Sequence, residues 1–101
     1  MHIGQVRFAW DLQKSAANLA ARGFDLEFAT LIFGGPTVET PDRRKDYGEE
    51  RIVAIGLAQG IELTVVYTDR VVPGDVERRI ISARRSDRHE RKVYKAALSQ
   101  P

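Results

Sequence analysis

Apolar positions in the first third of the chain follow two different periods. Between residues 3 and 10 they partly alternate with polar positions, which favours a β-strand. From residue 12 onward they recur at helical spacing and form one stripe of an amphipathic helix. This stripe consists of Leu12, Ala16, Leu19 and Ala20. Asp11 is suited to cap this helix and Gly23 to end it. A second short helix follows Asp25 and is broken at Gly34-Gly35-Pro36.

The rest of the pattern predicts four further strands and a final helix. Prolines at both ends of residues 37–40 favour an edge strand there. The three later strands are separated by short connections, so we expect them to be antiparallel neighbours. They span residues 50–57, 61–68 and 76–85, with a polar loop at 42–48 and a type II turn at 72–75. Ser86 is suited to cap a helix that runs to about Leu98. This order predicts a single α+β domain over residues 1–101.

Several classes of protein are excluded by the composition. The chain has no cysteine, which rules out disulfides, thiolate nucleophiles and cysteine-bound zinc. Its two histidines, His2 and His89, do not form a ligand cluster, so we expect no metal and no cofactor. The sequence contains no apolar run of about 20 residues and no segment typical of a signal peptide. We therefore expect a cytoplasmic protein without a membrane partner.

Positive charge is concentrated towards the end of the chain. The net charge is only +2, but residues 70–95 alone carry +5. Seven of the nine basic residues in this segment are arginines, which bind planar anions through paired hydrogen bonds. Such a local field is typical of a nucleic-acid-binding surface. A solvated surface that only keeps the protein soluble explains the charge alone equally well.

The last strand places arginines on both faces of the sheet. Strict alternation puts Arg78, Ile80, Ser82 and Arg84 on one face, and Glu77, Arg79, Ile81, Ala83 and Arg85 on the other. Arginines near the rim of a core need an anion or a carboxylate partner. Neighbouring strands offer Glu49, Glu50 or Glu62 as such partners, which is the purely structural explanation.

The final helix begins directly after this strand. Glu90 and Tyr94 are four residues apart and therefore lie on one helical face, although an ordinary helix surface explains their spacing as well. Where sheet meets helix, we expect a convergence of Arg84, Arg85, Glu90, Arg91 and Tyr94. Arg51 opens the middle strand, and it shares a face with Val53 and Ile55.

Segments along almost the whole chain resemble the BrnT toxins of bacterial toxin–antitoxin pairs. The matching segments are Phe8-Ala9-Trp10-Asp11 with Lys14 and Asn18, Gly23-Phe24, Ala29 to Phe33, Glu50-Arg51 with Gly56, Val65-Val66-Tyr67-Thr68, and Arg79 to Arg85 with Glu90-Arg91 and Tyr94. Ile-Ile-Ser-Ala-Arg-Arg followed by Glu-Arg-x-x-Tyr is the most specific part. The chain departs from the family at Ala21-Arg22, where a basic residue and His are usual, and in a longer turn at 71–75.

The resemblance implies a RelE-like fold and the activity of a toxin. The expected fold is a compact antiparallel sheet of about four strands, with two N-terminal helices and one C-terminal helix. The expected activity is RNA cleavage that inhibits translation and arrests growth. The expected partner is a BrnA-like antitoxin with a ribbon-helix-helix region, which neutralises the toxin. The complex of toxin and antitoxin is expected to bind its own promoter DNA and repress transcription.

This resemblance leads to a hypothesis for the site. Cleavage without a metal uses the neighbouring 2′-hydroxyl of RNA, with Arg51 and Arg84 stabilising the phosphate in one exposed pocket. Glu90 is the candidate base, and Tyr94 or His89 supplies a proton. The residues expected to bind RNA are Arg79, Arg85, Arg91 and Lys14 along its backbone, with Tyr67 or Trp10 stacking on a base. The alternative is a non-catalytic basic module within an antitoxin–DNA repressor complex.

Overall fold

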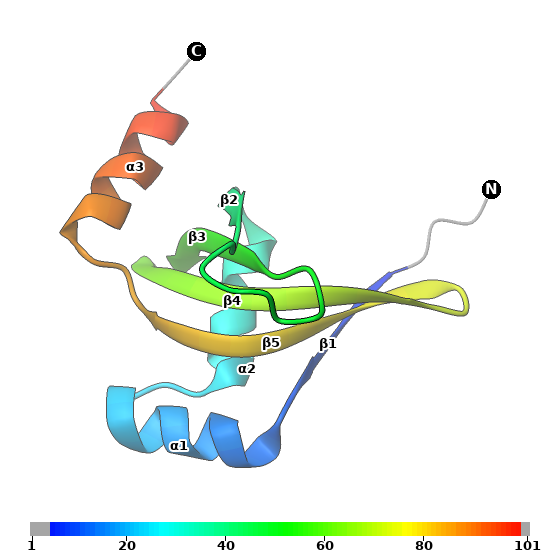
Figure 1. Cartoon of the computed structure of the whole chain (residues 1–101). Helices are drawn as coiled ribbons and strands as arrows, with labels where there is room; N and C mark the ends of the chain where they lie inside the picture. The colour runs from blue at the N-terminus through cyan, green and yellow to red at the C-terminus, as the bar shows by residue number, and fades with distance from the viewer. Residues whose placement is uncertain (1–4, 100–101) are drawn as a thin grey trace.

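The computed structural model describes residues 5–99. It consists of a five-stranded sheet with helices on one face and at one end (Figure 1). In chain order the elements are β1 (Val6–Trp10), α1 (Leu12–Arg22), α2 (Leu26–Ala29), the 3-10 helix η1 (Thr30–Gly34), β2 (Val38–Pro41), β3 (Ile52–Ala58), β4 (Ile61–Val72), β5 (Asp75–Arg85) and α3 (Arg88–Leu98). The α+β class is confirmed. Residues 3 and 4 of the predicted first strand, and His2, lie outside the described residues.

The sheet is mixed and has the order β1-β5-β4-β3-β2. Strands β2 to β5 pair antiparallel, as the short connections predicted for β3, β4 and β5, but β1 pairs parallel with β5. The expectation of about four purely antiparallel strands is therefore wrong. The first and last strands have no tight turn between them, so no local signal fixes their relative direction.

The β4–β5 hairpin is longer than the sequence predicted. Strand β4 continues to Val72, which pairs with Asp75 across a turn made by Pro73 and Gly74. Gly74 has a φ of +80°, the conformation that a type II turn requires at its third position. Each residue from 69 to 72 pairs with a residue of β5, so the two strands remain paired up to this turn.

A β-bulge interrupts the alternation of side chains in β5. Val66 pairs with Ser82 and the next residue, Tyr67, pairs with Ile80, so Ile81 has no residue opposite it. Ile80 and Ala83 are three residues apart, yet both are buried in the core. The predicted face assignment is therefore wrong beyond residue 80. Ser82 and Arg84 lie on the face opposite to Ile80, together with Arg79.

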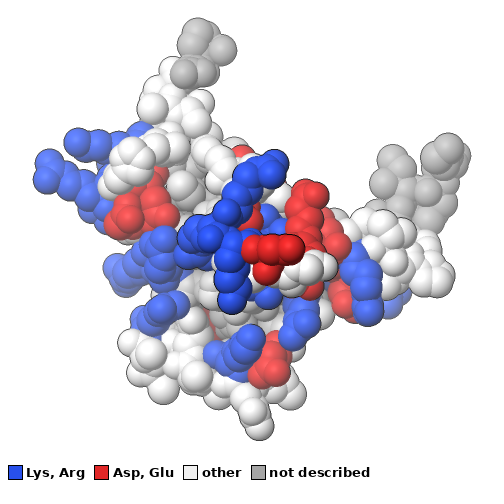
Figure 2. All heavy atoms as spheres, viewed as in Figure 1, with Lys and Arg blue, Asp and Glu red and all other residues white. Residues whose placement is uncertain are grey.

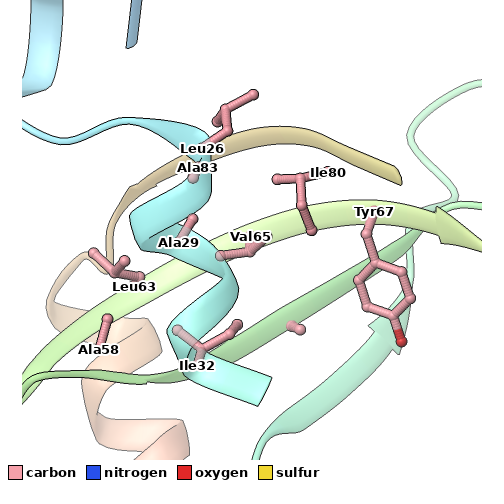
Figure 3. Packing of buried hydrophobic residues seen from close by; sticks show 10 residues of the cluster. Leu26, Ala29, Ile32, Ala58, Leu63, Val65, Tyr67, Ile80 and Ala83 are labelled. Atoms are coloured by element: carbon pink, nitrogen blue, oxygen red, sulfur yellow. The ribbon is translucent and has the colours of Figure 1, made fainter. Parts of the chain in front are cut away.

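The hydrophobic core lies between the sheet and the α2–η1 segment (Figure 3). Helical spacing brings Leu26, Ala29 and Ile32 onto one side of this segment, where each is almost completely buried. The segment approaches β3 closely at Gly56. A Cβ atom at this position would lie 2.8 Å from the Cβ of Ile32, so only glycine allows this distance between backbone and helix.

Helix α1 packs on the molecule through its polar side. Ser15 is its buried residue, while Leu12 and Leu19 are 79% and 51% exposed. The stripe of Leu12, Ala16, Leu19 and Ala20 thus faces solvent, although such a stripe normally faces the core. We call it the α1 stripe.

Helix α3 extends away from the end of β5 (Figure 1), and Tyr94 is its buried residue. Its N-cap is Asp87, whose carboxylate accepts from the Glu90 amide in a capping box, so the prediction of Ser86 as the cap is wrong. Ser86 is buried and shares a 2.8 Å hydrogen bond with Thr64. None of the helices within residues 5–99 has the length and apolar character needed to cross a membrane.

Candidate functional site

Four arginines line a hollow on the face of the sheet opposite to α2. They come from three parts of the chain: Arg22 ends α1, Arg43 and Arg44 follow β2, and Arg84 lies near the end of β5. The floor is formed by Val53, Thr64, Val66 and Ser82, and two carboxylates, Asp42 and Glu90, complete the lining. We call this cavity of about 450 Å³ the arginine hollow. Figure 2 shows basic side chains gathered across this face with acidic groups among them.

Arg84 and Glu90 meet in the arginine hollow. Arg84 Nη1 donates to Glu90 Oε1 at 2.7 Å and Nη2 donates to Oε2 at 2.9 Å. Glu90 Oε1 also accepts from the Asp87 amide at 2.8 Å. The guanidinium of Arg84 is the main reason that the pKa of Glu90 is lowered to about 2. The side chain of Arg84 remains 45% exposed, so an external anion can reach it.

The loop after β2 is held in place by Asp42. This carboxylate is buried and accepts from Arg44 Nε at 2.9 Å and from Nη2 at 2.8 Å. The same hydrogen bonds lower the pKa of Asp42 to about 2. Its backbone amide donates to the carbonyl of Arg51 at 2.8 Å, which closes the loop. The arrangement fixes Arg44 at the edge of the hollow while leaving most of its side chain in solvent.

Arg22 reaches across from α1 to the last strand. Its Nη1 donates to the carbonyl of Ala83 at 2.7 Å and is 3.4 Å from Asn18 Oδ1. Sequence reasoning missed Arg22, Arg43 and Arg44 as site residues. The available signals were the departure from the family pattern at Ala21-Arg22 and the basic run within residues 42–48, which was interpreted only as a polar loop.

The expected gathering of Arg51 and Arg84 in one pocket is wrong. Arg51 donates to Glu49 Oε2 at 3.0 Å and stacks over the ring of Tyr47 at 4.0 Å. It lines a separate hollow formed by the 41–51 loop, next to the one that contains Arg84. Each guanidinium already has its own carboxylate, and the two lie in neighbouring cavities.

Both candidate tyrosines are buried. Tyr94 is 2% exposed, and its hydroxyl donates to the carbonyl of Pro36 at 2.9 Å. Tyr67 is 3% exposed and donates to Glu39 Oε1 at 2.6 Å, while Arg78 covers its ring at 4.2 Å. Burial and the bond to Glu39 raise the pKa of Tyr67. Neither ring lines the arginine hollow, so the structure does not bring them to Arg84.

The remaining predicted residues are spread over the surface. Arg79 lies with Trp10 in a cavity of about 630 Å³ that also contains four acidic side chains. Arg85 lies on the opposite face of the sheet beside Phe24 and Phe28. Arg91, Lys14 and His89 also lie outside the arginine hollow. Arg91 donates to the carbonyl of Ser86, and Lys14 lies over Ile81 and Ser82. His89 is exposed on α3. Of the predicted site residues, only Arg84 and Glu90 come together in the arginine hollow.

Carboxylates neutralise two of the four strand arginines, Arg78 and Arg84, but the partners are not the glutamates that neighbouring strands offered. Arg78 forms two bonds of 2.9 Å with Asp69, and Arg84 pairs with Glu90. Glu49, Glu50 and Glu62 take no part in these pairs within the described residues. The hollow thus combines a reachable, paired guanidinium with further arginines, which suits it to bind an anion such as a phosphate.

Within residues 5–99, no three His, Asp or Glu side chains are grouped so that they could hold a metal ion. The groups that the hollow itself offers for chemistry are its guanidinium groups and its two carboxylates. Guanidinium groups can stabilise charge that develops on a phosphate, and a carboxylate can accept a proton.

Comparison with known proteins assigns the chain to a family. The family model described as the ribonuclease toxin BrnT of type II toxin–antitoxin systems matches residues 10–90. This match includes all four arginines of the hollow and ends at Glu90. A search of curated proteins finds no match. The chain therefore belongs to the BrnT family of ribonuclease toxins of type II toxin–antitoxin systems.

Proposed function

We propose that this protein is an endoribonuclease that cleaves RNA at the arginine hollow without using a metal ion. The observation that carries the proposal is the meeting of Arg84 with Glu90 among three further arginines, on an open face of the sheet. Membership of the family supports an RNA substrate and an antitoxin partner. The geometry supports the hollow as the place where the phosphate binds.

The phosphate binds first to Arg84. Its guanidinium can form two parallel hydrogen bonds to phosphate oxygens, as it does to Glu90 in the free protein. Arg22, Arg43 and Arg44 surround this position and hold the neighbouring phosphates of the RNA backbone. Loss of one well-placed donor to the reacting phosphate reduces the rate by roughly 10² to 10³.

Phosphate binding also releases Glu90, the proposed base, from Arg84. While it is bound to Arg84, Glu90 has a pKa of about 2 and is a weak proton acceptor. When the phosphate replaces Glu90 on Arg84, the carboxylate loses the main cause of its lowered pKa and becomes a stronger base. Substrate binding and activation of Glu90 are therefore coupled through one guanidinium.

The reaction is an internal transfer. The 2′-hydroxyl gives its proton to Glu90, its oxygen forms a bond to the adjacent phosphorus, and the bond from phosphorus to the 5′-oxygen breaks. The products are a 2′,3′-cyclic phosphate and a 5′-hydroxyl end. The leaving oxygen takes its proton from solvent, because Tyr94 and His89 do not line the hollow.

The biological role that we propose follows the family. The protein, acting in the cytoplasm as a single RelE-like domain, inhibits translation and arrests growth by cleaving RNA. A BrnA-like antitoxin with a ribbon-helix-helix region neutralises it, and promoter DNA is bound only by the complex.

Mapping of RNA ends tests this proposal. Purified protein is incubated with RNA in the presence of a chelator, and new 5′-hydroxyl ends are expected. Arg84→Ala should lose cleavage while it keeps its fold. Arg70→Ala is the matched control, because Arg70 also pairs with a glutamate across 3.0 Å but does not line the arginine hollow. Full cleavage by Arg84→Ala, or cleavage only when metal is added, would contradict the mechanism.

A non-catalytic binding module is the second candidate. It is favoured by the observation that Arg84 and Arg44 are already paired with carboxylates in the hollow. The same experiment separates the two candidates, because a binding module retains RNA or antitoxin on the hollow but leaves RNA intact at high protein concentration.

A further inference from the structure

Three polar side chains determine which face of α1 lies against the protein. Ser15 Oγ accepts from the Leu26 amide at 2.9 Å, and Asn18 Nδ2 donates to the Phe24 carbonyl at 2.8 Å. Arg22 Nη1 donates to the carbonyl of Ala83 at 2.7 Å. These residues are three or four positions apart, so they form one helical face. Because this polar face is bonded to the body of the protein, the apolar face of the same helix must point outward.

The α1 stripe is consequently an unpartnered apolar surface. Leu12 is 79% exposed and Leu19 is 51% exposed, and Ala16 and Ala20 between and beside them are also exposed. Leu12 and Leu19 are separated by two helical turns, or about 10 Å along the axis. Apolar side chains repeated in this way on an exposed helix are typical of a surface that binds another protein.

The stripe continues into a cavity at the C-terminal end of α1. Leu19 lines this cavity together with Phe24, Phe28 and Ile61, and its volume is about 370 Å³. The centroids of the two phenylalanine rings lie 5.9 Å apart. We call this cavity the phenylalanine hollow. A partner that lies along the α1 stripe can therefore insert a large apolar side chain beside these rings.

The surroundings of this surface are positively charged. Arg22 and Arg85 line the phenylalanine hollow, and helix α1 itself contains no acidic residue. Among residues 5–99 the guanidinium of Arg85 forms no ion pair. The carboxylate at this rim, Asp25, already accepts from the Phe28 amide as the cap of α2. Charge complementarity thus favours an acidic partner, and it disfavours a second copy of this chain, which would place like charges together.

We propose that the α1 stripe and the phenylalanine hollow form the docking surface for an acidic, amphipathic helical segment of the antitoxin. The proposal rests on the proposed function, because it requires a toxin that has such a partner. The partner's apolar side chains cover Leu12 and Leu19, one of them fills the phenylalanine hollow, and its carboxylates pair with Arg85 at the rim of that hollow.

Arg22 connects this surface with the site of cleavage. It lines both the phenylalanine hollow and the arginine hollow. A segment docked on α1 therefore ends next to the position of the RNA phosphates. The antitoxin accordingly neutralises the toxin by covering the approach to the arginine hollow from the α1 side.

Substitutions on the stripe test the docking surface. The probe is the BrnA-like antitoxin of the same toxin–antitoxin pair, co-expressed and then titrated against purified toxin. Leu12→Glu and Leu19→Glu should each weaken binding by about 30-fold or more, because buried apolar anchors dominate such interfaces. Arg85→Glu should weaken it by at least about 10-fold, and this loss should shrink at high salt. Val71→Glu is the matched control, since Val71 is an 85% exposed apolar residue at the β4–β5 hairpin and should bind normally.

RNA cleavage provides an independent readout. Leu19 does not line the arginine hollow, so free Leu19→Glu should cleave RNA as the unchanged protein does but should escape inhibition by the antitoxin. Unchanged antitoxin affinity in both leucine variants would overturn the proposal. So would a toxin that is dimeric alone and becomes monomeric in Leu19→Glu, because a second copy would then occupy the stripe. If the unchanged protein cleaves no RNA, the proposed function fails. The antitoxin affinities of the leucine variants still show whether the α1 stripe is the docking surface.

Discussion

The substitution Glu90→Gln separates the two roles that the structure allows for this residue. Glutamine at the third position of a helix can still accept from the Asp87 amide, so the capping box and the start of α3 are retained. The carboxylate that pairs with Arg84 and that could accept a proton is lost. If Glu90 is the base, kcat should fall by about 10²- to 10⁴-fold. KM should stay the same or decrease, because Arg84 no longer has to leave a carboxylate before it binds phosphate.

Stability provides a second magnitude for the same variant. The pKa of Glu90 is lowered from 4.5 to about 2, which corresponds to at most about 3 kcal/mol of folding free energy. Because Arg84 is 45% exposed, solvent screening reduces this to about 1 to 2 kcal/mol. A group whose pKa is lowered on folding stabilises the protein above the pKa of the unfolded chain. This contribution is therefore complete above pH 4.5 and is lost as the pH falls towards 2.

Two assays check these expectations. Urea unfolding at pH 7 should show a lower free energy for Glu90→Gln, and the difference should vanish towards pH 2. Steady-state cleavage of an RNA oligonucleotide gives kcat and KM, and single-turnover cleavage gives the rate of the chemical step separately from binding and product release. Glu77→Gln is the control, since Glu77 pairs with Arg70 outside the arginine hollow. An unchanged kcat with a lower KM would refute the base, and it would leave Glu90 as only the counter-ion of Arg84.

Three further outcomes follow from other parts of the structure. Gly56→Ala should lower the free energy of unfolding by about 1 to 3 kcal/mol in a urea titration, because the new Cβ would lie 2.8 Å from Ile32 Cβ. Tyr94→Phe should cost about 1 kcal/mol in the same assay, by losing the bond to the Pro36 carbonyl, and should leave RNA cleavage within about two-fold; a large loss of kcat would instead place Tyr94 in the reaction. Asp42 has a pKa of about 2, so its stabilising contribution is present above its usual pKa of 3.8 and lost as the pH falls towards 2. Asp42→Asn should remove that part of the acid sensitivity, as measured by thermal melting between pH 5 and pH 2.

Local sequence signals predicted most of the elements correctly. The cap at Asp11, the stop at Gly23 and the turn at Pro73-Gly74 all appear in the structure, because each depends on a few neighbouring residues. The parallel pairing of β1 with β5 was not predictable in this way, since it joins strands about 70 residues apart. The orientation of α1 was also hidden. Ser15 is hydrogen-bonded to Leu26 of α2, and Asn18 to Phe24 in the turn before it. These bonds hold the polar side of α1 against the protein, and they could not be predicted because they depend on tertiary contacts.

The candidate site was predictable only in part. The pair of Arg84 and Glu90 follows from a strand that leads directly into a helix, and this proximity was correctly expected. Arg51 was misplaced, because the loop of ten residues between β2 and β3 lets Glu49 and Tyr47 bind its guanidinium. Arg22 could not be assigned from spacing, since its contact with β5 joins residues 61 positions apart.

The bulge at Ile81 makes the site depend on how β5 pairs with β4 as well as on the identity of its residues. Side chains alternate between faces along a strand, so the single additional residue at Ile81 decides which surface each arginine beyond it reaches. If Ile81 were instead paired regularly opposite Val66, Arg84 would turn towards the core and Arg85 would be exposed in its place. Loss of the bulge in a strand of unchanged length would thus reverse inside and outside for every residue up to the start of α3, whereas deletion of Ile81 together with the bulge would leave each of them on its present face.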